Sequence, residues 1–157
     1  MLMSPVRYPK HALKQAVWHL RDVSPLPPGF TREIPVRCPG DVAQKLRFLF
    51  EDLAQEQLMV VMLNARNHVQ AVDIVTVGTL NSSLGHPREV HRSAVACLAS
   101  SIILMHNHPS GNPEPSHEDI EPTHQIKQAG EILGIPLHDH IIVAGNTYTS
   151  LAERGQL

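Results

Sequence analysis

Cysteine is scarce in this chain, which has two among 157 residues. Cys38 and Cys97 cannot build a disulfide framework or a cysteine-rich zinc site. Long apolar runs are also missing, since no stretch approaches the ~18 residues of a membrane span. Residues 1–15 lack the apolar segment of a secretory signal. We therefore expect a cytoplasmic protein that does not interact with membranes.

An excess of positive charge is lacking as well, because the formal net charge is −2. Residues 1–40 contain six Lys and Arg against two acids, whereas the remaining residues contain seven against thirteen. Proteins that bind nucleic acids usually carry clustered basic residues. We therefore expect nucleic-acid binding to be weak or absent.

The length and the 42% apolar content predict one globular domain with an appendage. Pro25, Pro27 and Pro28, followed by Gly29, break the chain. We predict that residues 1–38 form a basic, proline-rich appendage, with a short helix over residues 10–21. Residues 39–157 then form the domain.

The domain sequence alternates strand and helix patterns, which predicts an α/β fold with helices packed on one sheet. Apolar or β-branched segments predict strands over residues 57–63, 68–77, 101–106, 137–143 and 146–150. Helical spacing and capping residues predict helices from Asp41 to about Leu53, over 87–99 and over 116–133.

Histidine is abundant, with eleven residues, and one segment concentrates the chemistry. His106 and His108 end an apolar strand and project to the same side of it. Asp119 lies in the first turn of the helix that follows. Two His and one Asp leave a fourth tetrahedral position for water, which is typical of a catalytic zinc site. Such an ion lowers the pKa of its water to roughly 7.

Simpler interpretations of these residues remain open. A lone His-x-His is weak evidence, and His138 and His140 form a second one. Ser116 and Asp119 also form a capping box, independent of any metal. The loop between His108 and Ser116 contains three prolines and Gly111, which fix its shape. A loop with a fixed shape favours a metal site over a plain connection. The Ser116 hydroxyl can cap the helix and also donate to a developing oxyanion.

The pattern His106-x-His108-Pro…Ser116-x-x-Asp119 resembles the JAMM motif of MPN-domain zinc metalloproteases. Segments 78–90, 106–111 and 139–155 are similar to the bacterial RadC family, and the resemblance covers residues 39–157. It implies a single MPN domain, similar to the cytidine-deaminase-like fold, with a mixed sheet. It also implies one zinc ion held by His106, His108 and Asp119. The family's general acid/base corresponds to Glu56, which the residues alone would not distinguish from the other acids.

Two features depart from the family pattern. The helix-hairpin-helix region common in RadC proteins is not recognisable here, which weakens any transfer of a DNA-repair role. Pro122 stands inside the predicted helix and removes the amide that would bond to the carbonyl of Glu118. We expect a kink or a loosened turn near Asp119. We expect this change to shorten the helix and not to move Asp119 away from the metal position.

These observations favour a zinc metallohydrolase that cleaves peptide or isopeptide bonds in a peptide or protein substrate. A nucleobase deaminase needs His-x-Glu followed by Pro-Cys-x-x-Cys, which the two distant cysteines cannot supply. A non-catalytic MPN interaction module and a DNA-associated RadC-type factor remain as alternatives. The substrate and the oligomeric state stay open.

The charge distribution predicts at most weak, non-specific DNA binding, on the order of 10⁻⁴–10⁻⁶ M at physiological salt. The acidic residues of segment 41–157 should repel phosphates. Titrating labelled duplex and single strands at ~50 and ~200 mM salt checks this expectation. Nanomolar binding that survives the higher salt would contradict it.

Overall fold

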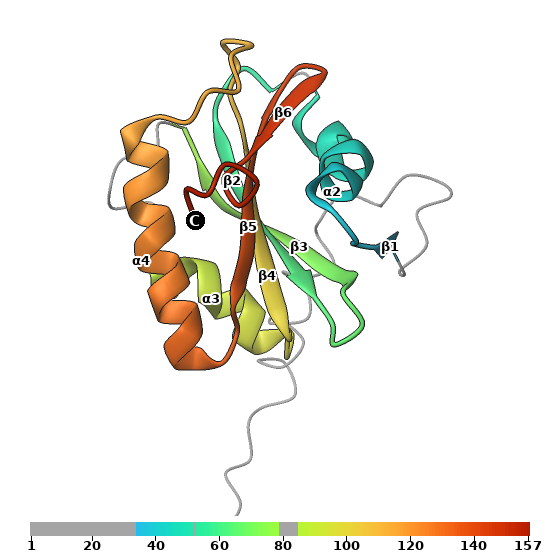
Figure 1. Cartoon of the computed structure of the whole chain (residues 1–157), viewed down its shortest axis with the longest axis vertical. Coiled ribbons are helices and arrows are strands. Elements are labelled where there is room, and N and C mark those ends of the chain that lie inside the picture. Colours follow the sequence, from blue (N-terminus) through green and yellow to red (C-terminus); the bar gives the residue numbers. More distant parts are fainter. Residues whose placement is uncertain (1–33, 52, 79–84) are drawn as a thin grey trace, which may run out of the picture. The chain divides into compact units, whose positions relative to one another are not determined.

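The computed structural model describes residues 34–51, 53–78 and 85–157. The predicted helix over residues 10–21 therefore lies outside the described residues. Six strands form one sheet in the order β1-β3-β2-β4-β5-β6 (Figure 1). Only β4 and β5 pair in parallel among the described strands. The strands are β1 (Ile34–Pro35), β2 (Gln57–Leu63), β3 (His68–Val77), β4 (Ser101–Asn107), β5 (Leu137–Ala144) and β6 (Thr147–Ser150). Together with the helices, this mixed sheet confirms the predicted α/β class.

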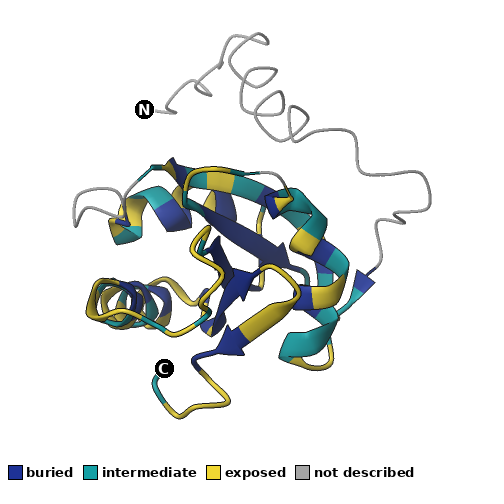
Figure 2. Ribbon diagram, turned by 90° about the horizontal axis from the view of Figure 1, so that it is seen from above, coloured by how far each residue is buried: buried dark blue, intermediate teal, exposed yellow. Residues whose placement is uncertain are grey.

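Helices cover both faces of the sheet. α3 (Pro87–Ala96) and α4 (His117–Leu133) lie on one face, and α2 (Pro39–Leu46) with the 3-10 helix η1 (Arg47–Phe50) lies on the other (Figure 1). Seen from above, the buried strands lie between helices whose outer sides are exposed (Figure 2). No helix in the described part of the chain is both long and apolar enough to cross a membrane.

Side chains along β4 point alternately to the two faces of the sheet, and those on the core side continue to the end of the strand. Ile102 and Leu104 belong to the cluster that packs β2 and β4 against α3 and α4. His106 is the next residue with this orientation, because side chains on a strand repeat every two positions. The face that packs against α4 therefore ends in an imidazole.

The helix that provides the predicted aspartate runs without interruption through Pro122. Asp119 lies in the turn before this proline, where Ser116 holds it by hydrogen bonds. The loss of one amide at Pro122 therefore leaves the first turn in place. Gly134 ends α4 in the left-handed conformation that suits glycine (φ 69°), as predicted.

The ends of two other helices differ from the prediction. α2 begins at Pro39 because proline suits the first helical position, and Asp41 accepts the amide of Arg37 instead of capping. α3 ends at Ala96, three residues early, since Leu98 takes a positive φ of 55°. The boundary at residue 38 stays a prediction, although Ile34 and Pro35 already pair with β3.

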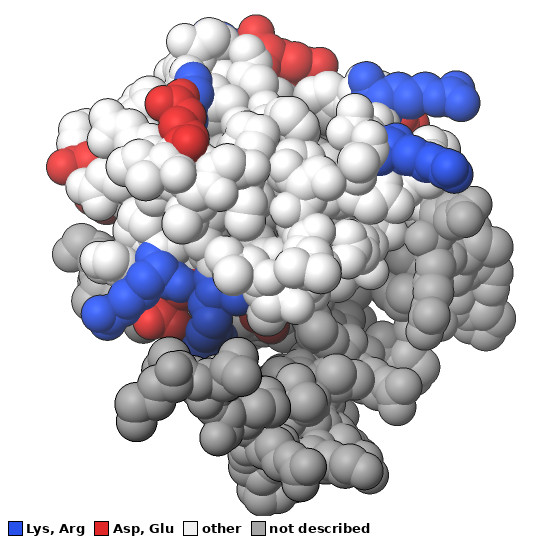
Figure 3. Space-filling view, turned by 90° about the horizontal axis from the view of Figure 1, so that it is seen from below, with Lys and Arg blue, Asp and Glu red and all other residues white. Residues whose placement is uncertain are grey.

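Charged side chains form small groups on the face seen from below. Lys and Arg lie in separate groups at the right and the lower left, Asp and Glu lie mainly at the top and the upper left, and the area between them is uncharged (Figure 3). This described face offers no continuous basic patch of the kind that phosphate binding needs.

The close approach at Gly130 predicts that Gly130→Ala destabilises the domain. A Cβ there would lie 2.5 Å from the backbone oxygen of Ile135, which cannot rotate away. We expect a loss of about 1–3 kcal/mol from overpacking, more than the gain of roughly 0.5–1 kcal/mol from replacing a helical glycine. Thermal unfolding measures the difference.

Gly40→Ala is the matched control, since the nearest neighbour of its Cβ would be the hydroxyl of the half-exposed Tyr148 at 3.2 Å, at the end of a flexible side chain. This variant should unfold close to the wild-type temperature. Equal stability of both variants would contradict the packing argument.

Candidate metal centre

Two histidine rings meet at the end of β4. The His106 side chain is fully buried, and His108 follows the strand with its ring at the edge of an open cavity. Their Nε2 atoms lie 2.9 Å apart. The predicted projection to one side is therefore confirmed.

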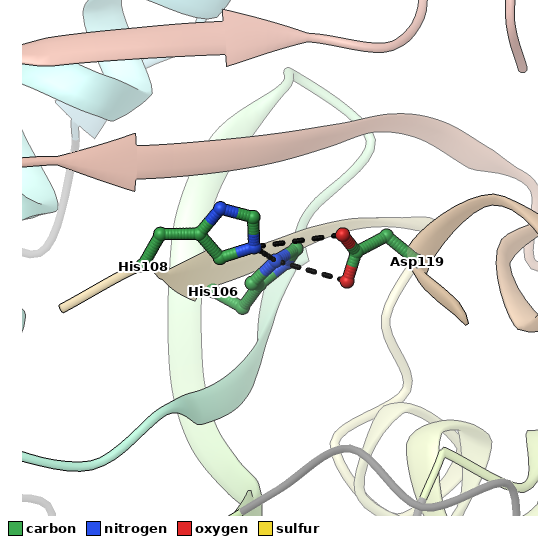
Figure 4. Close-up of side chains that lie close together, drawn as sticks. All are labelled: His106, His108 and Asp119. Carbon is green, nitrogen blue, oxygen red and sulfur yellow. Dashed lines mark hydrogen bonds and ion pairs between the residues drawn. The ribbon is translucent and has the colours of Figure 1, made fainter. Parts of the chain in front are cut away.

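Asp119 completes a group of three side chains (Figure 4). Its Oδ1 lies 3.2 Å from His106 Nε2, and its Oδ2 lies 3.5 Å from His108 Nε2. Ligand atoms bound to one tetrahedral zinc at ~2.0–2.1 Å stand roughly 3.3–3.4 Å apart. The two imidazole nitrogens and the carboxylate therefore lie close enough together to bind a single ion.

The hydrogen bond of His108 shows which ring nitrogen is free. Its Nδ1 lies 2.8 Å from the backbone oxygen of Asn112. A carbonyl can only accept, so Nδ1 carries the hydrogen, and the neutral ring has its lone pair at Nε2. That lone pair faces His106 and Asp119, as a metal ligand requires.

His106 is held from its other side by a buried chain of contacts. Its Nδ1 lies 2.7 Å from His140 Nε2, and His140 Nδ1 lies 2.6 Å from Thr123 Oγ1. Thr123 in turn donates to the backbone oxygen of Asp119 at 2.5 Å. Burial, and secondarily the neighbouring His106, lowers the pKa of His140 well below its ordinary value, so this ring is neutral. His138, its partner in the second His-x-His, is exposed and belongs to no metal-ligand group within the described residues.

The carboxylate of Asp119 is kept ionised. Burial alone would raise the pKa of Asp119, but a protonated His106 ring lowers it through its hydrogen bond and its charge. The amide and hydroxyl of Ser116 add two further donors to Oδ2, at 2.7 and 2.6 Å. Together these contacts hold the pKa of Asp119 far below its usual range.

Ser116 is the N-cap of α4, as predicted, and it orients the ligand carboxylate. Its hydroxyl has one hydrogen, and the structure gives that hydrogen to Asp119. The oxyanion contact of Ser116 stays a prediction, and it requires the hydroxyl to change partner.

Glu56 lines the same cavity as His108 and Asp119. This open cavity has a volume of about 380 Å³ and is lined by Glu56, His108, Ser110, Asn112, Glu114, Ser116, Glu118 and Asp119. A second open cavity, of about 430 Å³, reaches His108 from the side of Phe50 and Val143. The structure thus brings Glu56 to the site, while its role in catalysis stays a prediction.

The prediction overlooked Asn107, which anchors the backbone around Glu56. Its Oδ1 accepts the amide of Gln57 at 2.8 Å, and its Nδ2 donates to the carbonyl of Gln55 at 3.1 Å. The residue between the two histidines therefore connects the end of β4 to the start of β2. Its position between the two histidines was the available signal, but its partners at and just before the start of β2 could not be read from it.

Comparison with known proteins places the site in a family context. Residues 36–156 match the RadC-like JAB domain family. A UPF0758 protein of Desulforamulus reducens is 47% identical over 128 residues, which cover 82% of this chain and 56% of the relative. A UPF0758 protein of Salinibacter ruber is 50% identical over 120 residues, covering 76% of this chain and 52% of the relative. The chain spans about half the length of the curated relatives it matches, and these matches confirm the resemblance that the motifs indicated.

The three converging side chains predict one equivalent of zinc per chain. The double variant His106→Ala/His108→Ala should lose it, because one carboxylate alone cannot retain the ion through dialysis. Mass spectrometry of the dialysed protein measures the metal content.

The exposed pair His124→Ala/His138→Ala serves as the control, since both rings lie outside the site. It should keep a full equivalent. Zinc retained by the first double variant would place the metal elsewhere.

Proposed function

The chain belongs to the RadC-like JAB domain family, and on that premise we propose that it is a zinc-dependent hydrolase that cleaves peptide or isopeptide bonds. One observation carries the proposal: three proton acceptors converge at the edge of an open cavity that is also lined by Glu56. Because the chain spans about half of its relatives' length, the proposal concerns the activity of this domain.

The donor set fits a catalytic zinc ion better than a structural one. His106, His108 and Asp119 supply two imidazole nitrogens and a carboxylate. Structural zinc sites are usually closed by four protein ligands, often thiolates, whereas catalytic sites leave a position open. The cavity beside His108 and Asp119 supports such an open position.

The residues around the ion have separate roles in the proposed reaction. A zinc ion here supplies Lewis-acid polarisation of the scissile carbonyl and a lowered pKa for a coordinated water. Glu56 accepts the proton of the attacking water and returns it to the leaving amine. Asn107 keeps the backbone of Glu56 in place. The cavities on either side of His108 give an extended substrate room on both sides of the scissile bond.

Substitution of the acid/base should separate catalysis from metal binding. Glu56→Gln keeps the shape of the side chain but removes the proton acceptor, so hydrolysis should fall by ~10²–10⁴-fold while zinc is retained. A library of quenched peptides and lysine-linked isopeptides, assayed with metal-loaded protein, measures the loss.

Glu118→Gln is the matched control, because Glu118 lines the same cavity without an assigned role. Its hydrolysis should stay near wild type. Loss of zinc in Glu56→Gln would make Glu56 a ligand or a folding residue. A zinc-loaded wild type that cleaves nothing in the library would favour a non-catalytic interaction module.

A further inference from the structure

We propose that Thr123 and His140 are positioning residues that fix the ring tautomer of His106 so that its Nε2 lone pair faces the metal position. The inference rests on the metal site proposed above. It extends that site from three ligands to a buried hydrogen-bond chain that runs from the backbone oxygen of Asp119 through Thr123 and His140 to His106.

The first group of the hydrogen-bond chain is the Thr123 hydroxyl, and its two partners fix where it donates and where it accepts. Thr123 Oγ1 lies 2.5 Å from the backbone oxygen of Asp119 and 2.6 Å from Nδ1 of His140. A hydroxyl has one hydrogen, and a carbonyl can only accept. The hydrogen of Thr123 therefore goes to Asp119, so the hydroxyl oxygen must accept from His140, whose Nδ1 carries the hydrogen.

The same reasoning passes from His140 to His106. A neutral ring protonated at Nδ1 has its lone pair at Nε2. His140 Nε2 thus accepts across the 2.7 Å contact, and His106 Nδ1 donates. A neutral His106 then has its own lone pair at Nε2, 3.2 Å from the Asp119 carboxylate. The opposite order would place a hydrogen on Nε2 and block metal binding.

Burial keeps water from competing for the hydrogen bonds of this chain. His106, Asp119, Thr123 and His140 are at most 3% exposed. Thr123 lies one helical turn after Asp119 on α4, so the helix that provides the carboxylate ligand also sets the tautomer of a histidine ligand on β4. His108 does not depend on this chain, because Asn112 orients it directly.

The Thr123 hydroxyl can be tested without any substrate. Thr123→Val keeps the branched shape of the side chain but removes the hydroxyl that links Asp119 to His140. Zinc affinity should therefore fall by about 10–100-fold. Competition with a chromogenic chelator measures this affinity. Thr123→Ser restores the hydroxyl and should recover near-wild-type affinity. Thr76→Val is the matched control, because this buried hydroxyl has no partner among the described residues. Unfolding of the metal-free variants separates lost affinity from lost folding.

A second measurement uses the wild type alone. Long-range ¹H–¹⁵N NMR of the metal-free protein should show His140 neutral and protonated at Nδ1, and zinc-loaded protein should show the same for His140 with His106 also protonated at Nδ1. A hydrogen at His140 Nε2, or Thr123→Val with wild-type zinc affinity, would overturn the inference. The proposed metal centre fails by a different result, which is full zinc retention after His106→Ala/His108→Ala.

Discussion

Two imidazole rings and one carboxylate stand close together in a largely buried position. The His106 and His108 Nε2 atoms and the Asp119 carboxylate lie 2.9–3.5 Å apart. Their ring nitrogens and carboxylate oxygens can share one cation or proton among them, and Oδ2 of Asp119 also accepts from the amide and hydroxyl of Ser116. The surrounding structure therefore has to hold three polar groups within a few ångströms of one another.

The sheet and one helix provide that support. β4 lies between β2 and β5 in the sheet, so hydrogen bonds on both sides fix the backbone that ends in His106. Ser116 turns the start of α4 toward this strand end and holds the carboxylate with two donors. The packing of α4 on the same face as Leu104 then carries Asp119 to the imidazoles. Ligand position is thus a consequence of ordinary core packing.

Much of the candidate site was accessible from the sequence, because its signals are local. The two-residue period of a strand placed His106 and His108 together, and the Ser116-x-x-Asp119 spacing marked a helix start. Helix ends were less accessible. Leu98 ends α3 through a positive φ that apolar periodicity does not reveal, and Pro39 competes with Asp41 as the start of α2.

The sequence by itself determined the class of the fold, the candidate ligand residues and their order along the chain. Each of these depends on neighbours a few positions apart, where backbone geometry is nearly invariant. Only the tertiary structure decided which groups hold His106 and the backbone around Glu56 in place. Asn107 meets the backbone at Gln57 across 50 positions, and His106 meets His140 across 34. Such hydrogen bonds depend on strand register and on the position of α4 over the sheet, which are set by packing of the whole domain.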